Sequence, residues 1–274
     1  MKNVPNSRPN LDKAIQRFAG NIVKANELRN LMANAIVAQM LGKGVVKGGS
    51  GLKFRYGAKM TRVTLDLDTA WTTSLEDFLN DLNPKLEKGW NGFTGSIKIL
   101  RQATPRGIPF DYVMQPCEVK LLYLGRPWYT VQLEIGHNEI GDADGYDEID
   151  APKELSDLFD FLAMGLPHPI PAMRLEYQVA QKLHGVSAPH SKRAHDLIDL
   201  QLIMANDIVE LSIVAELCRQ LFKYRKVHAW PPIIVKGEVW DRVYEEQKGS
   251  LPVLNTVDEA VLWANELIEK IDNA

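Results

Sequence analysis

Two aspartates stand two residues apart in the stretch TRVTLDLD, residues 61–68. If this stretch is a strand, Asp66 and Asp68 leave the same face, with Cα atoms roughly 6.5 to 7 Å apart. Such a pair can hold Mg²⁺, which binds a few carboxylates together with phosphate oxygens and water. The same alternation is also typical of a solvent-facing strand with two exposed acids. The aspartates alone leave both interpretations open.

A glycine pair and a serine precede the aspartates. Gly48, Gly49 and Ser50 follow the apolar pair at residues 45–46 and precede a segment of helical character that runs to Tyr56. A turn of this kind points backbone N–H groups and a helix N-terminus toward an anion such as phosphate. Six cations and no acid lie in the same twenty residues: Lys43, Lys47, Lys53, Arg55, Lys59 and Arg62. This basic run predicts either a phosphate-binding surface or an ordinary solvated face.

Better-known nucleotide and hydrolase motifs are absent from the sequence. There is no GxxxxGK[ST], and GKGVVKGG does not fit GxGxxG. In GGSGL, Leu52 replaces the last glycine of GxSxG. The stretch HNEIGDADGYDEID, residues 137–150, carries six acidic residues without the EF-hand order, so we expect a solvated acidic loop there.

The composition limits the classes of partner. The 274 residues carry a net charge of -3 with a pI near 6.1, so any nucleic-acid contact must depend on a local patch. Cys117 and Cys218 lack CxxC spacing, which argues against a zinc site or a disulfide framework. No apolar signal region opens the chain, and no uncharged run approaches the roughly 20 residues of a bilayer span. We therefore expect a cytoplasmic protein without a membrane partner.

The positions of the candidate residues depend on the elements that carry them. The apolar spacing predicts one or two helices from Asp12 to about Leu41. A further helix is predicted between a cap at Ser74 and an end at Gly89. Residues 92–135 have the pattern of several strands, with TPRGIP and LGRP as turns.

The second half of the chain has a different character. GLPHPIP, residues 165–171, cannot be helical, and the pattern beyond Ala172 is almost wholly helical. The predicted fold class is therefore α+β. We expect a domain with a small mixed β-sheet and N-terminal helices over residues 1–164, followed by a helical domain over residues 165–274.

Three charged residues of the second half fall on predicted helices. In LEYQVAQKLHG the apolar residues form a stripe, and Lys182 lies at its edge, able to reach solvent or a cleft. Asp196 and Asp199 are three residues apart and share one helical face. A surface lysine and two surface or capping acids are the alternative interpretation.

The order of these blocks resembles the minimal nucleotidyltransferase domain of the DNA polymerase β superfamily. It is most similar to the AbiEii/AbiGii group of bacterial toxins, which includes the MenT tRNA-modifying toxins. The first match is KGGSGLKFRYG, followed by an R-x-[ST]-x-D-x-D pattern made by Arg62, Thr64, Asp66 and Asp68. The later blocks LEYQVAQKLHG and SKRAHDLIDLQLI are similar to the AxKL and RxxDLxDL motifs of the family. The resemblance covers residues from about 45 to 204.

The resemblance implies roles for the matching residues of the first half. Asp66 and Asp68 would bind one or two Mg²⁺ ions. The third carboxylate of the superfamily sits on a later strand, where Glu134 in TVQLEIG is the best candidate, either as a metal ligand or as a proton acceptor. The implied nucleotide-binding residues are Gly48, Gly49 and Ser50, which would hold the β and γ phosphates, with Lys47, Arg62 and Thr64.

For the second half, the resemblance implies a helical domain that closes over the triphosphate. Lys182 would neutralise charge on the triphosphate as pyrophosphate leaves. Asp196 would orient Lys182 or the nucleotide, and Asp199 is the neighbouring candidate for the same role.

The function implied by the resemblance is transfer of NMP from an NTP to an acceptor. In the tRNA-modifying members the acceptor is the tRNA 3′ end, and the protein would act as the toxin of a toxin–antitoxin or phage-defence system with a cognate antitoxin. The basic run and RQLFKYRKVH, residues 219–228, could supply tRNA phosphate contacts. Two alternatives stay open: a protein or small-molecule acceptor, and a nucleotide-binding module with a degenerate site.

Overall fold

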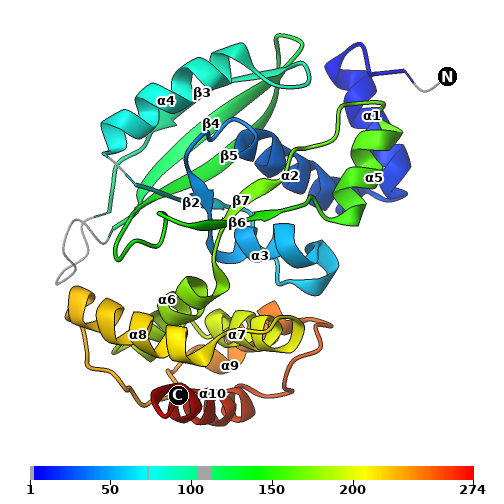
Figure 1. Cartoon of the computed structure of the whole chain (residues 1–274). Helices are drawn as coiled ribbons and strands as arrows, with labels where there is room; N and C mark the ends of the chain where they lie inside the picture. The colour runs from blue at the N-terminus through cyan, green and yellow to red at the C-terminus, as the bar shows by residue number, and fades with distance from the viewer. Residues whose placement is uncertain (1–2, 73, 104–112) are drawn as a thin grey trace. The chain divides into compact units, whose positions relative to one another are not determined.

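The computed structural model describes residues 3–72, 74–103 and 113–274, and the turn predicted at TPRGIP, residues 104–109, lies outside them. The described residues form a seven-stranded sheet and ten α-helices, which divide into two compact units (Figure 1). We call them the sheet unit and the helical unit. The sheet unit comprises Met1–Ala58, Thr64–Asn138 and Ala143–Ala172, and the helical unit comprises Lys59–Val63, Glu139–Asp142 and Met173–Ala274.

The first part of the chain alternates helices and strands. In order, its elements are α1 (Arg8–Ala19), α2 (Ile22–Ala38), β1 (Val45–Val46), α3 (Gly48–Tyr56), a short 3₁₀ helix (Ala58–Met60), β2 (Leu67–Trp71), α4 (Leu75–Lys88), β3 (Phe93–Ile99), β4 (Gln115–Tyr123), β5 (Arg126–His137), β6 (Tyr146–Ile149), α5 (Lys153–Phe161) and β7 (Ile170–Met173).

The sheet is mixed, and its strand order is β3-β4-β5-β2-β1-β7-β6 (Figure 1). Strands β3, β4 and β5 form an antiparallel meander, and the turn predicted at LGRP lies in the β4–β5 hairpin. β5 pairs parallel with β2, β2 pairs antiparallel with β1, and β1 pairs parallel with β7. β2 is therefore the fourth of seven strands and has a partner strand on each side.

One face of the sheet packs against α2 and α4. On β5, Leu133 and Ile135 are buried, whereas Gln132 is exposed and Glu134 is half-buried. The buried strand residues join one hydrophobic cluster with the apolar residues of the two helices. Because side chains alternate along a strand, the opposite face of the sheet carries the polar residues.

Local signals explain where several helices begin and end. Ser74 caps α4 by accepting a hydrogen bond from the N–H of Asp77, and Gly89 ends the helix with a φ of 75°, as predicted. The predicted helical segment near the N-terminus forms two helices. Gly20, with a φ of 80°, ends α1, and Asn21 caps α2 by accepting a hydrogen bond from the N–H of Lys24.

The strand predicted over TRVTLDLD is shorter than expected. β2 begins at Leu67, while Val63 and Leu65, which alternation predicts to be half-buried, are 66% and 60% exposed. Pairing with β5 also begins at Leu67, although β5 itself begins at Arg126; the carbonyls of Thr64 and Leu65 bond to side chains instead. The prediction that the whole stretch is a strand is therefore wrong. Asp68 lies on β2, and Asp66 lies in the bend just before it.

The region beyond Ala172 is almost wholly helical, as predicted. Its helices are α6 (Leu175–Ser187), α7 (His195–Asn206), α8 (Leu211–Arg225), α9 (Trp240–Lys248) and α10 (Val257–Asp272). Thr256 and Glu259 form a capping box that begins α10. Of the helices in the described residues, none combines the length and the apolar character needed to cross a bilayer.

Candidate active site

The polar face of the sheet brings together residues from three neighbouring strands. Asp68 on β2 is the register partner of Glu134 on β5, and neighbouring strands lie about 4.8 Å apart. Lys47 follows β1 directly, and its N–H donates to the carbonyl of Asp68 at 2.9 Å. Register partners point to the same face of a sheet, here the face opposite Leu67 and Leu133, which are buried. Two half-buried carboxylates and a lysine therefore share one face.

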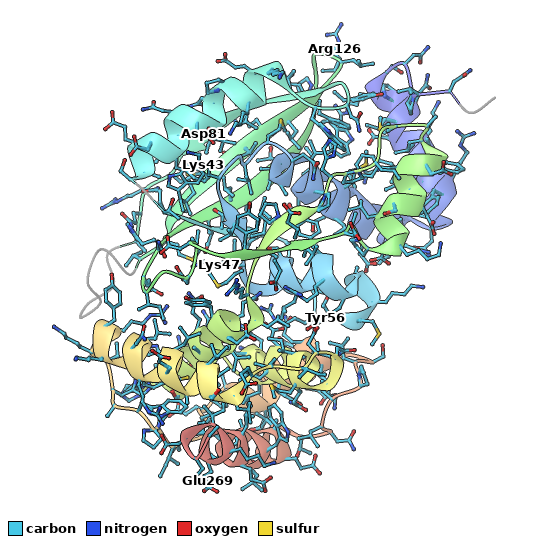
Figure 2. All side chains as sticks on the ribbon, in the orientation of Figure 1. Lys43, Lys47, Tyr56, Asp81, Arg126 and Glu269 are labelled. Atoms are coloured by element: carbon cyan, nitrogen blue, oxygen red, sulfur yellow. The ribbon has the colours of Figure 1, made fainter. Side chains whose placement is uncertain are left out.

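Helix α3 begins beside Asp68. Lys47 is its N-cap, and Gly48, Gly49 and Ser50 form its first turn; Figure 2 labels Lys47 and Tyr56 at the two ends of this helix. Gly48 has a φ of 61°, and a Cβ at this position would overlap Oδ2 of Asp68, so both the backbone and the contact require glycine. The first N–H groups of a helix carry a partial positive charge. The carboxylate of Asp68 therefore lies against an end of α3 that can bind an anion.

Ser50 joins α3 to β2. Its Oγ accepts a hydrogen bond from the N–H of Asp68 at 3.1 Å and donates to the carbonyl of Lys47 at 3.1 Å, and the side chain is buried. A serine hydroxyl has a single proton to donate. Because the carbonyl of Lys47 takes this proton, the hydroxyl of Ser50 positions Asp68, and a phosphate contact at Ser50 falls to its main-chain N–H.

Lys47 lies along the polar face of the sheet. Its buried ammonium is 2.6 Å from the position that a Cβ would take at Gly136 of β5. Gly136 is two residues beyond Glu134 and therefore on the same face. The missing side chain at Gly136 makes room for the ammonium, so a cation lies on the same face of the sheet as the two carboxylates.

Asp66 and Thr64 lie before the strand. Asp66 is exposed, and the register places Asp68, not Asp66, beside Glu134. The carbonyl of Thr64 accepts a hydrogen bond of 2.5 Å from Nζ of Lys53, a buried lysine of α3. A metal site shared by Asp66 and Asp68 stays a prediction.

The basic run does not form one surface. Lys47 and Lys53 are buried, Arg55 pairs with Asp147 at 2.6 Å, and Lys43 and Lys59 are exposed. Arg62, the sixth cation of the run, belongs to the helical unit and pairs with Asp199, as described below. Neither a single solvated basic face nor a continuous phosphate-binding surface describes these residues.

Lys182 is a buried residue of the helical unit. It is 4% exposed, and its Nζ lies 3.2 Å from Oδ1 of Asp196 and 2.5 Å from Oδ2 of Asp199. Both aspartates are buried on α7. The alternative of a surface lysine with surface or capping acids is therefore wrong, and the structure brings together the three residues that the two later motifs contain.

Two arginines complete this ion network. Nε of Arg62 lies 3.0 Å from Oδ1 of Asp199, and Nε of Arg193 lies 2.5 Å from Oδ2 of Asp196. Burial raises the pKa of Asp196, but the charges of Arg193 and Lys182 lower it, and the resulting pKa lies well below its ordinary value. Burial lowers the pKa of His195 to about 4, so its ring is neutral at pH 7. Arg62 belongs to this network and not to strand β2.

The predicted solvated acidic loop is largely structured. Asp142 is fully buried and accepts hydrogen bonds from Nε2 of Gln181 and from the N–H of Glu139. Glu139 forms an ion pair of 2.5 Å with Arg225. The prediction failed for Asp142 and Glu139, because their side-chain partners lie on α6 and α8, far along the chain, whereas Asp144, Glu148 and Asp150 are exposed, as predicted.

Sequence reasoning missed several polar residues in and beside the site. Asn30 and Asn34 are buried on α2, and the Nδ2 of each donates to the carbonyl of Leu65. Gly136 was missed as well. The asparagine pair has a visible signal, because two amides at i and i+4 interrupt the apolar run NLMANAIVA. The glycine has none, because its role depends on the path of the Lys47 side chain.

The carboxylates of the sheet unit fit a hard divalent cation. Among the described residues, no three His, Cys, Asp or Glu side chains gather as a metal site on their own. Mg²⁺ typically takes only one or two protein carboxylates and completes its shell with substrate phosphates and water. Asp68 and Glu134 in register, beside a helix N-terminus suited to phosphate, provide such a donor set.

The arrangement defines a class of protein. A mixed sheet with paired carboxylates on its polar face, followed by a helical unit, is the architecture of a nucleotidyltransferase. The family model described as "Nucleotidyl transferase AbiEii toxin, Type IV TA system" matches residues 29–264. The chain belongs to this family and is a nucleotidyltransferase. Its membership in the toxin family of a type IV toxin–antitoxin system implies an NTP substrate and a cognate antitoxin.

One solved structure shares the fold, and two more are similar at lower scores. The chain is similar to MenT4, a nucleotidyltransferase toxin from Mycobacterium tuberculosis H37Rv, with a TM-score of 0.60 and 16% identity over 96% of this chain and 90% of that one. JHP933 from Helicobacter pylori gives a TM-score of 0.47 at 15% identity over 89% of both chains. A nucleotidyltransferase of H. pylori, described as putative, gives 0.45 at 18% identity over 90% of this chain and 94% of that one. No curated protein matches the sequence.

Proposed function

We propose that this chain transfers a nucleoside monophosphate from an NTP to an acceptor hydroxyl in a Mg²⁺-dependent reaction. The observation that carries the proposal is the register pairing of Asp68 with Glu134 beside the N-terminus of α3. This geometry offers carboxylates for a cation and N–H groups for phosphate within one compact unit. Phosphoryl transfer requires mainly such positioning and charge stabilisation from the protein.

The proposed reaction forms one bond and breaks one. The acceptor oxygen bonds to the α-phosphorus, and the bond from that phosphorus to the oxygen leading to the β-phosphate breaks, so pyrophosphate leaves. The proton of the acceptor passes to Glu134 or to water. Mg²⁺ held by Asp66, Asp68 and Glu134 would supply charge stabilisation for the attacking and leaving oxygens.

The nucleotide contacts in this proposal come from the beginning of α3. The N–H groups of Gly48, Gly49 and Ser50 donate to the β and γ phosphates. The ammonium of Lys47 neutralises part of the charge, since it lies on the same face as the carboxylates.

For the helical unit, we propose that Lys182 neutralises charge on the leaving pyrophosphate. Two of the three donors of its ammonium bind Asp196 and Asp199, which fix its position. Arg62 supports this arrangement by pairing with Asp199. We also propose that Thr64 contacts the nucleotide. This contact would come from its side chain, because its main-chain carbonyl already accepts a hydrogen bond from Lys53.

The acceptor that the family resemblance favours is the 3′ end of tRNA. Modification there would block aminoacylation and so translation, which suits a cytoplasmic toxin in toxin–antitoxin or phage-defence systems. A protein or small-molecule acceptor is the second candidate, favoured by the dispersal of the basic run over buried, paired and exposed positions.

The test is incubation of the purified protein with total tRNA, Mg²⁺ and each α-labelled NTP in turn. We expect label to enter tRNA with one NTP, with release of pyrophosphate. Asp68→Asn and Glu134→Gln should lower the rate by at least about 100-fold, because each removes a charge from the reacting site. Matched controls are Asp157→Asn, at an exposed ion pair on α5, and Glu118→Gln, on β4, which should retain the wild-type rate.

Each outcome selects one function. If pyrophosphate release needs Mg²⁺ but not tRNA, the result would favour a protein or small-molecule acceptor over tRNA. Nucleotide binding without pyrophosphate release under any condition would favour the degenerate module and overturn the proposed reaction.

A further inference from the structure

The two residues before Asp66 are held by their main chain. The carbonyl of Leu65 accepts a hydrogen bond from Nδ2 of Asn30 at 3.0 Å and a longer one from Nδ2 of Asn34 at 3.5 Å. The carbonyl of Thr64 accepts one from Nζ of Lys53 at 2.5 Å. Two successive carbonyls are thus bound by side chains from two different helices of the sheet unit, α2 and α3.

At the start of this segment, Arg62 is held by its ion pair with Asp199, but the residues between Arg62 and Asp66 have no regular secondary structure. Residues 62–65 belong to no helix or strand, and the side chain of Leu65 points to solvent. The pairing of β2 with its neighbours begins only at Leu67. Asp68 is therefore fixed by strands on both sides, whereas the backbone that carries Asp66 depends on the bound carbonyls.

Apart from the bonds that their Nδ2 groups donate, the asparagines are poorly suited to their surroundings. Asn30 and Asn34 are 3% and 1% exposed, and they interrupt a run of apolar residues on α2. Their Oδ1 atoms find no hydrogen-bond partner within the described residues, which is unfavourable for a buried acceptor. Leucine at either position would have nearly the same shape, a better helix propensity and no orphaned atom. The bonds of both side chains to Leu65, and that of Asn30 to the hydroxyl of Tyr129 at 3.3 Å, are the features that leucine could not supply.

We propose that Asn30, Asn34 and Lys53 form a carbonyl clamp that positions Asp66 for metal binding. These three are positioning residues, because they act through the backbone and not on the substrate. The inference rests on the proposed function, since it concerns the same metal site. Partners that orient metal-binding carboxylates typically change metal affinity by about 10- to 100-fold when they are removed.

The test uses the full-length protein with the double variant Asn30→Leu/Asn34→Leu. Gln39→Leu is the matched control, because Gln39, at the end of the same helix, also bonds to main-chain atoms, those of His168. Three quantities are measured: the melting temperature, the affinity for Mn²⁺ by electron paramagnetic resonance, and amide hydrogen exchange across residues 62–68. The apparent Mg²⁺ requirement of nucleotide transfer is a fourth.

We expect the double variant to keep its melting temperature, because the removal of two orphaned buried acceptors offsets the loss of the bonds to Leu65 and Tyr129. Exchange across residues 62–68 should accelerate at least about 10-fold, and Mn²⁺ should bind about 10-fold or more weakly. Gln39→Leu should leave exchange and Mn²⁺ affinity unchanged. A variant with wild-type exchange and wild-type Mn²⁺ affinity would overturn the clamp.

The clamp and the proposed function can fail separately. If the wild type transfers no nucleotide but the double variant loses Mn²⁺ affinity, the reaction is wrong and the clamp stands. If the double variant does not fold, Lys53→Met and Asn34→Leu alone carry the same test. Acceleration of exchange with unchanged Mn²⁺ affinity would overturn the assignment to metal binding.

Discussion

Gly48 and Asp68 depend on each other at the level of single atoms. The carboxylate occupies the space that a side chain at position 48 would need, and the backbone of Gly48 is left-handed. Ser50 adds a hydrogen bond to the N–H of the same aspartate. A side chain added at position 48 would therefore disturb both the anion-binding end of α3 and the carboxylate that we assign to the metal.

We expect Gly48→Ala to reduce nucleotide transfer by at least about 10-fold and stability by about 1–2 kcal/mol, since alanine is disfavoured at positive φ. The matched control is Gly125→Ala in the β4–β5 turn, where φ is 75° and nothing lies within 4 Å of an added Cβ. It should show the same loss of stability with full activity. Urea denaturation and steady-state rates check both; equal activity of the two variants would contradict the role of the Asp68 contact.

At the scale of elements, α6 and α7 are joined by buried charges. Lys182 on α6 binds two aspartates on α7, and Arg62 and Arg193 bind the same aspartates. Burial of a charge is tolerated only when it is paired, so the network holds together as a unit.

Removing Lys182 should therefore destabilise the helical unit. We expect Lys182→Met to lower the free energy of unfolding by about 3–5 kcal/mol, because it leaves buried carboxylates short of a cation. Lys153→Met, in an exposed pair on α5, should cost at most about 1 kcal/mol. Urea denaturation measures both. A loss that is no larger for Lys182→Met than for Lys153→Met would mean that the network contributes little to stability.

The packing of α6 against α8 should depend on pH through His184. Burial, then the charge of Arg225, lowers its pKa from 6.5 to about 3. The unfolded chain binds a proton below about pH 6.5 that the folded chain excludes, so stability is lost as the pH falls from 6.5 toward 3. His184→Asn keeps an acceptor for Arg225 without titrating, so its melting temperature should fall less between pH 7 and 5 than that of wild type.

The control for this pH dependence is His190→Asn, at an exposed position, which should keep the wild-type slope. Scanning calorimetry at several pH values gives the three slopes. A wild-type slope in His184→Asn would show that another group accounts for the pH dependence.

Elements with local signals were predictable, and those with distant partners were not. The capped helix α4 and the strand meander followed from Ser74, Gly89 and alternation. The limits of β2 did not, because Val63 and Leu65 alternate like strand residues but lie outside the described pairing of β2 with β5. Likewise, the candidate residues could be chosen from the sequence. The pairing of Arg62 with Asp199 could not be predicted, because Asp199 lies 137 residues further along the chain, on α7.

At the scale of the whole molecule, net charge and exposed cations bear on the proposed tRNA acceptor. The chain carries a net charge of -3, and in the basic run Lys43 and Lys59 are the exposed members. If the acceptor is tRNA, as proposed, contacts from this run to its phosphates are limited to a few side chains.

We expect tRNA binding to weaken with salt, and Lys43→Gln and Lys59→Gln each to reduce the slope of log Kd against log salt by about one or less. Lys153→Gln, distant in sequence from the run, should leave the slope unchanged. Filter binding at several salt concentrations gives the slopes. A steep slope that persists in both variants would assign the phosphate contacts to other cations, such as those of residues 219–228.

The position of β2 as the fourth of seven strands also bears on how long such a toxin persists in a cell. Proteases act on segments that open locally, and edge strands such as β3 and β6 open more readily than a strand paired on both sides. Clipping at an edge would leave Asp68 and Glu134 in their central pairing. Clearance of the active toxin should therefore follow the global unfolding equilibrium, so that substitutions that stabilise the sheet unit lengthen the time for which a cell is poisoned.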